Sequence, residues 1–167
     1  MNEPIDVLTP DGLPTGEVID KADAHRSGAW HRCAHVWIVS GSRVLLQRRA
    51  FAKENWPGKW DVSVAGHVGA AESAIDAAKR EAREELGLTL SNLEHIGTLR
   101  EQCVLNGGTY IDNEIHEVFV VRQDIDLAML TLDPAEVAEV ALVTLDDLDR
   151  YDLVPHPDEY ALITSFM

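Results

Sequence analysis

Basic residues, cysteines and long apolar runs are all scarce in this sequence of 167 residues. It has 14 lysines and arginines against 29 aspartates and glutamates, which leaves a formal net charge of −15. Because so acidic a surface repels phosphate backbones and anionic lipids, we expect binding to neither nucleic acid nor membranes. No apolar run is long enough to cross a bilayer.

The two cysteines, Cys33 and Cys103, lack a metal-binding spacing, and so few thiols indicate a reducing compartment. Residues 1–9 carry acids and lack the basic-then-apolar pattern of a signal peptide. We therefore expect a cytoplasmic protein. In so acidic a chain, the approach of any phosphate compound would need cations to screen the repulsion.

With 46% hydrophobic residues, the chain can form one domain with a sizeable core over residues 1–167. Turn residues predict an N-terminal hairpin at about 5–19, whereas residues 20–32 read as polar and irregular. Further strands are expected at 34–39, 44–48, near 61–66, 95–105, 110–121 and 139–143, with helices at 73–86 and 158–166. This order predicts an α/β fold of layers with a mixed sheet.

The strongest predicted helix, 73–86, collects three glutamates, Glu81, Glu84 and Glu85, on one arc. Like charges three and four residues apart weaken a helix, so the cluster calls for a reason. A solvated acidic face is the ordinary explanation. Converging carboxylates next to a glycine-bearing loop, residues 66–69, instead favour a hard divalent cation.

The full pattern resembles the signature of the Nudix hydrolases. It comprises Gly66, five residues, Glu72, seven residues, and then residues 80–88, "REAREELGL", which end with Gly87 and Leu88. Only Ala82 departs, since the family usually has a larger aliphatic residue there. The resemblance implies a Nudix-type α/β/α sandwich and a hydrolase that cleaves diphosphate bonds in nucleoside diphosphate-type or related small molecules.

The resemblance also implies roles for these residues. The Gly66 carbonyl with Glu81, Glu84 and Glu85 would hold Mg²⁺ or Mn²⁺, and an acid from outside the signature, Glu114, would join them. Glu84 or Glu81 would be the general base. Arg80 would pair with Glu72 or Glu81 to hold the metal ligands in position. Glu72 and Gly87 would be structural.

Residues 12–120 also resemble the isopentenyl-diphosphate isomerases, which share this fold. That resemblance implies a second metal set with a diphosphate-binding trio beside it. The metal set would be His25, His31, His67, Asp112 and Glu114, and the trio would be Lys21, Arg49 and Lys53. The alternative is that these histidines are ordinary hydrogen-bonded residues and that these basic residues are ordinary surface cations, since both are common in proteins.

Departures from the isomerases matter more. The isomerase cysteine that protonates the double bond falls at Ala65, and Cys33 and Cys103 do not match it. Glu81 and Glu84 restore hydrolase acids where such isomerases have other residues. We therefore predict a hydrolase, keep isopentenyl-diphosphate isomerase as the alternative that Ala65 disfavours, and retain a non-catalytic nucleotide-binding module as a third class.

Two further expectations concern residues outside these sets. His35, His95, His116 and His156 are expected to be surface or hydrogen-bonded residues rather than metal ligands, and Trp37 and Trp60 are expected in the core. The N-terminal hairpin could support a homodimer.

Overall fold

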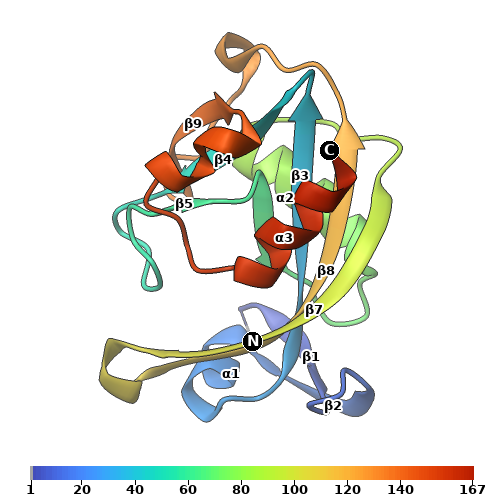
Figure 1. Ribbon diagram of the computed structural model, residues 1–167. Helices are drawn as coiled ribbons and strands as arrows, with labels where there is room; N and C mark the ends of the chain where they lie inside the picture. Colours follow the sequence, from blue (N-terminus) through green and yellow to red (C-terminus); the bar gives the residue numbers. More distant parts are fainter. Residues whose placement is uncertain (1) are drawn as a thin grey trace.

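The computed structural model describes residues 2–167 as two β-sheets with three α-helices packed around them (Figure 1). Strands β1 (Pro4–Leu8) and β2 (Pro14–Asp20) pair antiparallel in a small sheet. The chain then enters α1 (Lys21–Ser27). None of the helices in the described residues has the length and hydrophobicity to span a bilayer.

The main sheet has seven strands: β3 (His31–Ser40), β4 (Arg43–Arg49), β5 (Trp60–Asp61), β6 (Val64–His67), β7 (Glu94–Leu105), β8 (Tyr110–Arg122) and β9 (Val137–Val143). The central order is β5-β4-β3-β8-β7, with β6 on β3 and β9 on β4. Strands β3 and β8 run parallel, whereas the other pairs are antiparallel. The sheet is therefore mixed, as predicted.

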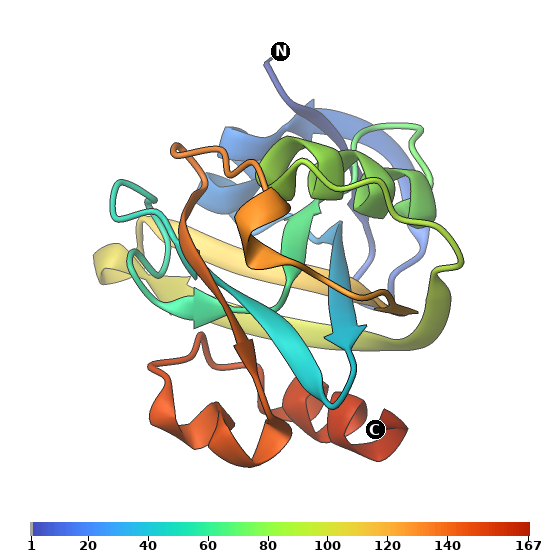
Figure 2. The same cartoon turned by 90° about the horizontal axis from the view of Figure 1, so that it is seen from above.

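Helices cover both faces of this sheet, which makes the fold the predicted α/β/α sandwich. Helix α2 (Ala74–Leu86) lies on one face and α3 (Pro157–Phe166) on the other, as the view from above shows (Figure 2). Short 3₁₀ turns lie in the connections at Asn106–Gly108, Leu127–Met129 and Leu145–Arg150. The N-terminal sheet and α1 lie together at one end of the molecule (Figure 1).

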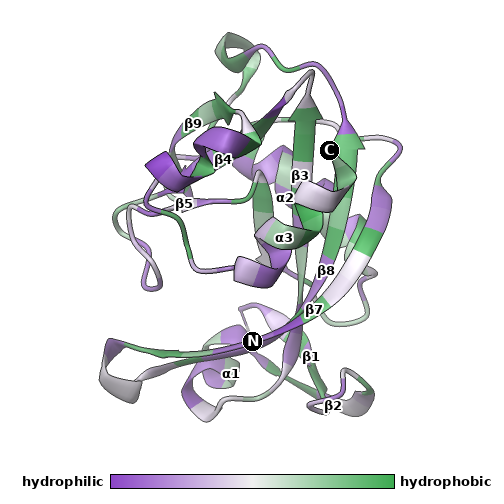
Figure 3. Ribbon diagram, viewed as in Figure 1, coloured by the Kyte–Doolittle hydropathy of each residue, from purple (hydrophilic) through white to green (hydrophobic). Residues whose placement is uncertain are grey.

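Strand β3 is buried on both faces, and its successive side chains pack alternately into the two hydrophobic cores on either side of the sheet. Val36 and Ile38 join the core under α2, whereas Trp37 and Val39 join the core under α3. The upper part of β3 is accordingly among the most hydrophobic parts of the ribbon (Figure 3). Trp37 is fully buried, and Trp60 packs against the second core, as expected for both.

Helix α2 has clear signals at both ends. The Ser73 side chain accepts a hydrogen bond from the Asp76 backbone N–H, which caps the first turn. Gly87 takes a left-handed conformation (φ 67°) and ends the helix. The predicted helix at 73–86 therefore agrees with the structure to within one residue.

The expectation that residues 20–32 are irregular was wrong. Residues 21–27 form α1, capped by the Asp20 side chain at its start and by left-handed Gly28 at its end. The helix is too short to show an apolar period, and its burial of Ala24 and His25 depends on packing against β8. Local caps and packing against β8 together stabilise this helix.

Candidate functional site

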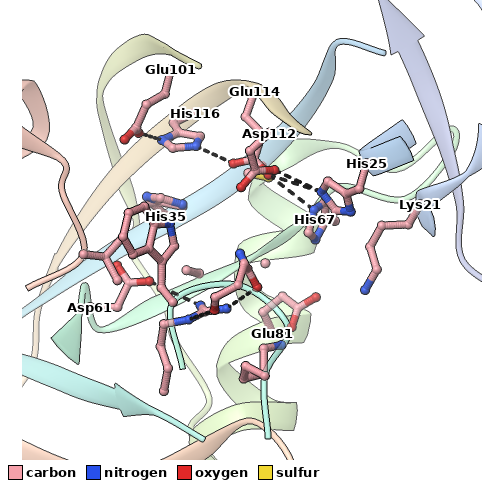
Figure 4. Close-up of a pocket in the computed structure, with 18 of the residues that line it drawn as sticks. Lys21, His25, His35, Asp61, His67, Glu81, Glu101, Asp112, Glu114 and His116 are labelled. Atoms are coloured by element: carbon pink, nitrogen blue, oxygen red, sulfur yellow. Dashed lines mark hydrogen bonds and ion pairs between the residues drawn. The ribbon is translucent and has the colours of Figure 1, made fainter. Parts of the chain in front are cut away.

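A single large pocket of 1240 Å³ brings most of the candidate residues together. Its walls come from α1, β3, β6, α2, β7, β8 and the start of α3, so residues more than 100 positions apart meet there. The close-up shows acidic and histidine side chains directed into this space (Figure 4). The three groups of side chains described next occupy different parts of its wall.

The three glutamates of α2 differ in their exposure. Glu85 is buried, and the side chains of Glu81 and Glu84 are 15% and 56% exposed. All three line the pocket. Burial raises the pKa of Glu85 well above its usual range, and the neighbouring Glu81 charge adds to the effect. Packing the buried Glu85 against Glu81 is costly unless a cation balances the two acids, which fits a divalent metal.

Gly66 and Glu81 lie in closer contact than any other residue type at position 66 would allow. A Cβ atom added at Gly66 would come within 2.3 Å of the Glu81 side chain, far inside van der Waals contact. Strand β6 therefore passes next to the acidic helix because position 66 has no side chain. Both the Gly66 backbone and the Glu81 carboxylate line the same part of the pocket.

Arg80 connects the acidic residues to the loop before α2. Its guanidinium makes two hydrogen bonds to the Glu72 carboxylate, each of 2.9 Å, and one of 2.8 Å to Glu81. It also donates to Glu84 at 3.3 Å and to the His67 carbonyl at 3.1 Å. Arg80 thus pairs with both of its expected partners, and Glu72 in turn accepts from the Gly69 N–H.

Two polar residues near the glutamates were missed by the sequence analysis. Gln47 on β4 donates to Glu85 at 2.6 Å and to the Ser63 carbonyl at 3.1 Å. Glu136, from the loop before β9, binds Lys53 at 2.5 Å and lines the pocket. Neither residue belongs to a local motif, so only the strand pairing that brings β4 and β9 beside α2 could reveal them.

A second group, which we call the outer set, consists of His25, His31, His67, Asp112 and Glu114. Ligand atoms of the three histidines and Glu114 all lie within 4.8 Å of one another. Glu114 Oε1 is 3.2 Å from His31 Nε2 and 3.4 Å from His67 Nε2, and Asp112 is 3.0 Å from His25. The five residues predicted as a second metal set therefore converge, although α1, β3, β6 and β8 supply them. Figure 4 labels His25, His67, Asp112 and Glu114 of this set.

The outer set has the chemistry of a metal site. Within residues 2–167, His67 Nε2 and Asp112 Oδ1 are buried without a well-aligned hydrogen bond, although His25 Nε2 lies 3.0 Å from the Asp112 oxygen. Burial lowers the pKa of His67 to about 4, so its imidazole is neutral and has a free lone pair. Burial and the adjacent Glu114 charge raise the pKa of Asp112 to about 7. A divalent cation would satisfy both orphan atoms and neutralise the two acids.

The predicted diphosphate-binding cations also line the pocket, and each has an acidic partner. Lys21 pairs with Glu3, and Lys53 pairs with Glu136. Arg49 donates twice to Asn55, at 3.0 and 2.7 Å, and is 3.4 Å from Asp61. Their partners therefore hold these cations on the pocket wall.

A third group lies deeper, and the sequence offered no reason to assemble it. We call it the inner set: His35, His116, His156, Asp61, Glu101 and Glu159, which come from β3, β8, β5, β7 and the α3 region. His35 is 2.9 Å from Glu159, and His156 Nδ1 is 2.8 Å from Glu101. His116 Nε2 lies 2.7 Å from Glu114 of the outer set. His35, His116 and His156 are hydrogen-bonded, as expected, but deeply buried, whereas His95 is exposed and contacts Glu117.

Position 65, where an isomerase would have its cysteine, is occupied by Ala65 on the pocket wall. The adjacent strand nevertheless brings a thiol close, because Cys33 pairs with His67 in the β3–β6 ladder. The Cys33 sulfur lies within 4.8 Å of ligand atoms of Glu114 and His116. Burial raises the pKa of Cys33 well above its usual range, so this thiol stays protonated.

This fold, in which the acidic helix α2 packs against strand β6 at Gly66, is that of a Nudix protein. The Nudix domain family matches residues 29–162, and the chain belongs to that family. The match covers the three groups and the diphosphate-binding trio, except for His25 and Lys21, which precede it.

Two curated relatives carry different names. Nudix hydrolase 3 of Arabidopsis thaliana is 39% identical over 155 residues, covering 89% of this chain, which spans about a fifth (20%) of the plant protein's length. An isopentenyl-diphosphate Delta-isomerase of Cereibacter sphaeroides is 34% identical over 142 residues, covering 85% of this chain and 78% of the isomerase. This chain is thus similar both to a protein named as a hydrolase and to one named as an isomerase.

Solved structures share the fold at low identity. A crystal structure from Deinococcus radiodurans aligns over 98% of both chains with a TM-score of 0.75 and 22% identity. The Nudix domain of NrtR from Shewanella oneidensis, solved with ADP-ribose, has a TM-score of 0.66 and 14% identity and covers 89% of this chain and 99% of that domain. A MutT Nudix hydrolase of Burkholderia pseudomallei aligns with a TM-score of 0.64 and 22% identity, over 78% of this chain and 95% of that one.

Proposed function

We propose that this protein is a Mg²⁺- or Mn²⁺-dependent hydrolase that cleaves the diphosphate bond of a nucleoside diphosphate-type or related small molecule. The observation that carries the proposal is the intact acidic helix wall, in which Glu81, Glu84 and Glu85 face one pocket beside Gly66. A purely binding module would have less need of all three acids, whose mutual repulsion weakens the helix.

The metal ligands in this proposal are Glu81, Glu84, Glu85 and the Gly66 carbonyl, with Glu114 joining from β8. Bound metal would neutralise the diphosphate oxygens and lower the pKa of a coordinated water. Arg80 holds Glu81 and Glu84 in place through its hydrogen bonds, while Glu72 fixes the guanidinium from the other side. These contacts fix the positions of the two carboxylates at the pocket.

The general base is Glu84 or Glu81, which differ in how tightly they are held. Glu81 accepts a 2.8 Å hydrogen bond from Arg80, whereas Glu84 is the more exposed side chain and accepts at 3.3 Å. A base must reach a water next to the scissile phosphorus, so separate Glu81→Gln and Glu84→Gln variants distinguish the two assignments. The variant that loses the acidic limb of the pH–rate profile without losing metal affinity identifies the base, because a general base must be deprotonated to act.

Lys21, Arg49 and Lys53 would bind the diphosphate. A substrate phosphate entering the pocket would exchange with the carboxylates that now neutralise them, Glu3 and Glu136 among them. In the same proposal the outer set holds a further metal ion through His25, His31, His67, Asp112 and Glu114. The protein would act in the cytoplasm on a small molecule, as a monomer or as a homodimer through the N-terminal hairpin.

The test is a panel of nucleoside di- and triphosphates, sugar nucleotides and prenyl diphosphates, incubated with Mg²⁺ or Mn²⁺. We expect phosphate or nucleotide release from at least one class, and a loss of about 100-fold or more in Glu85→Gln, since supporting residues alone are worth about 10–100-fold. Glu94→Gln on exposed β7 is the matched control. Release no faster than that of Glu85→Gln across the whole panel would contradict the proposal.

Isopentenyl-diphosphate isomerase is the second candidate, favoured by the Cereibacter sphaeroides relative and by the Cys33 thiol beside Glu114. Ala65 counts against it, because that side chain has no proton to donate. Deuterium uptake into isopentenyl diphosphate in heavy water measures this activity, and we expect none above background. Uptake abolished by Cys33→Ser would instead assign proton transfer to that thiol.

A further inference from the structure

The inner set contains more buried charge and more lone pairs than its own hydrogen bonds satisfy. The rings of His35 and His116 have centroids 4.1 Å apart, and His156 lies 5.3 and 5.6 Å from them. The side chains of these three histidines are at most 8% exposed. Imidazoles gather this closely in a protein interior when something between or beside them compensates their desolvation.

Two of the ring nitrogens are orphaned. Within the described residues 2–167, His116 Nδ1 and His156 Nε2 are buried and make no hydrogen bond. Carboxylate oxygens are close, with Glu101 at 2.9 Å from His116 Nδ1 and Asp61 at 3.2 Å from His156 Nε2, but both lie outside hydrogen-bond geometry. When a metal displaces its proton, each of these nitrogens offers a lone pair to a cation.

The charge balance points in the same direction. Asp61 has Arg49 as a counter-ion at 3.4 Å, and Glu114 is shared with the histidines of the outer set. This leaves Glu101, which is 31% exposed, and Glu159, which is 1% exposed, as two carboxylates without a lysine or arginine partner among the described residues. By displacing the protons that these imidazoles hold in the metal-free protein, a single divalent cation would balance these two charges.

The donor geometry is compact enough for one ion. Ligand atoms of His35, His156 and Glu159 lie within 4.8 Å of one another, and so do those of Glu101, His116 and His156. The two triads share His156, and His116 Nδ1 lies 3.9 Å from Glu159, so the five residues form one contiguous cluster. The centre opens on the same pocket as the acidic helix, which gives an ion a route to it.

We propose that His35, His116, His156, Glu101 and Glu159 form a transition-metal site, separate from both the acidic helix and the outer set. Three imidazole nitrogens with two carboxylate oxygens suit a borderline ion such as Zn²⁺ better than Mg²⁺, which prefers oxygen ligands. The site lies behind Glu114, whose second oxygen contacts His116, so its ion would fix the orientation of that carboxylate.

The direct test uses crystals of the unaltered protein grown with Zn²⁺ after chelation, with diffraction data on both sides of the zinc absorption edge. We expect an anomalous peak among His35, His116 and His156, in addition to any peak at the outer set. Anomalous peaks confined to the outer set and the acidic helix would overturn the inner site. The result does not depend on catalysis, so failure of the hydrolase proposal and failure of this one are distinguishable.

A solution test counts metal in variants. The double variant His25→Gln/His67→Gln disables the outer set, and we expect it to keep one tightly bound Zn²⁺ after dialysis. Adding His156→Gln should remove that ion, whereas adding His95→Gln, an exposed histidine, should not. Near-ultraviolet circular dichroism checks that each variant is folded.

Histidine NMR covers the case in which the multiple variants do not fold. In the unaltered, chelated protein, Zn²⁺ should shift the ring nitrogen signals of His35, His116 and His156 to those of coordinated imidazole. Imidazolium signals that persist at these three residues with excess Zn²⁺ would overturn the site, because they mean that protons and not a metal balance the carboxylates.

Discussion

Glu114 accepts a 2.7 Å hydrogen bond from His116 Nε2 through one carboxylate oxygen, while its other oxygen faces the outer histidines. The two residues are neighbours on β8, at positions that face the same side of the sheet. The histidines lower the pKa of Glu114 well below its usual range even though burial opposes this. Glu114 is therefore a carboxylate held ionised between two groups of imidazoles.

We predict that Gly66→Ala lowers activity because its methyl group would displace the Glu81 side chain, which it meets at 2.3 Å. The expected loss is about 10–100-fold, the range for a disturbed metal environment. Gly69→Ala is the matched control in the same loop, because its Cβ would meet Glu72 Oε1 at an ordinary 3.4 Å. Steady-state rates and thermal midpoints of both variants provide the measurement, and equal rates would contradict the prediction.

Arg80→Lys should also be impaired although it keeps the charge. The guanidinium binds Glu72 through two nitrogens and reaches Glu81, Glu84 and the His67 carbonyl as well. A lysine ammonium has three donors at one point and cannot reproduce this fork. We expect kcat to fall about 10–100-fold and the apparent affinity for Mg²⁺ to weaken. Reaction rates measured against metal concentration give both values. Arg83→Lys, one turn along the exposed face, should behave as the unaltered protein.

Gln47→Met tests a residue that no motif points to. Gln47 donates to the buried Glu85 at 2.6 Å, and methionine is of similar size but offers no donor. Without this donor the pKa of Glu85 should rise further, since the hydrogen bond opposes the effect of burial. Metal must then compete with a proton, so we expect the apparent Mg²⁺ affinity to weaken about 10-fold. A metal titration unchanged between pH 6 and 8 would contradict this.

Without metal, the protein should become less stable as the pH rises into the alkaline range. Burial acts to lower the pKa of His116, but the Glu101 and Glu114 carboxylates outweigh it and raise the pKa from 6.5 to about 10. Because the folded pKa is the higher one, the stabilisation is complete below pH 6.5 and is lost as the pH rises through about 10. The chelated protein should therefore show a falling thermal midpoint across this window.

The variant that checks this assignment is His116→Gln. In this variant the slope of the unfolding free energy against pH should decrease by the equivalent of about one proton. His95→Gln, on the exposed surface, should keep the slope of the unaltered protein. Thermal unfolding at a series of pH values, with and without metal, gives the comparison. A chelated protein of constant stability from pH 6.5 to 10 would show that His116 is not the group that titrates.

Much of the acidic wall could be predicted from the sequence because its parts are local. Helical spacing alone puts Glu81, Glu84 and Glu85 on one arc, and Ser73 and Gly87 mark the ends of the helix. The outer set needed more, since its residues come from four elements. Resemblance to the isomerases supplied that grouping, and the structure brings the five residues together.

Other features depend on long-range packing that no local pattern encodes. The helix at Lys21–Ser27 buries His25 against β8, and Gln47 reaches Glu85 only because β4 and α2 pack across one core. His35 and Glu159 are 124 positions apart and meet only when α3 closes over the sheet. Local spacing has no means of pairing such residues.

By itself, then, the sequence determined the order of the strands and of the two longer helices, the α/β class and the acidic helix, because hydrophobic period, caps and side-chain spacing act within a few turns of the chain. Only the tertiary structure decided which distant histidines and acids share one dry pocket. The physical reason is that burial and electrostatic pairing depend on what the folded sheet brings into contact, and these contacts convert separate polar residues into candidate metal sites.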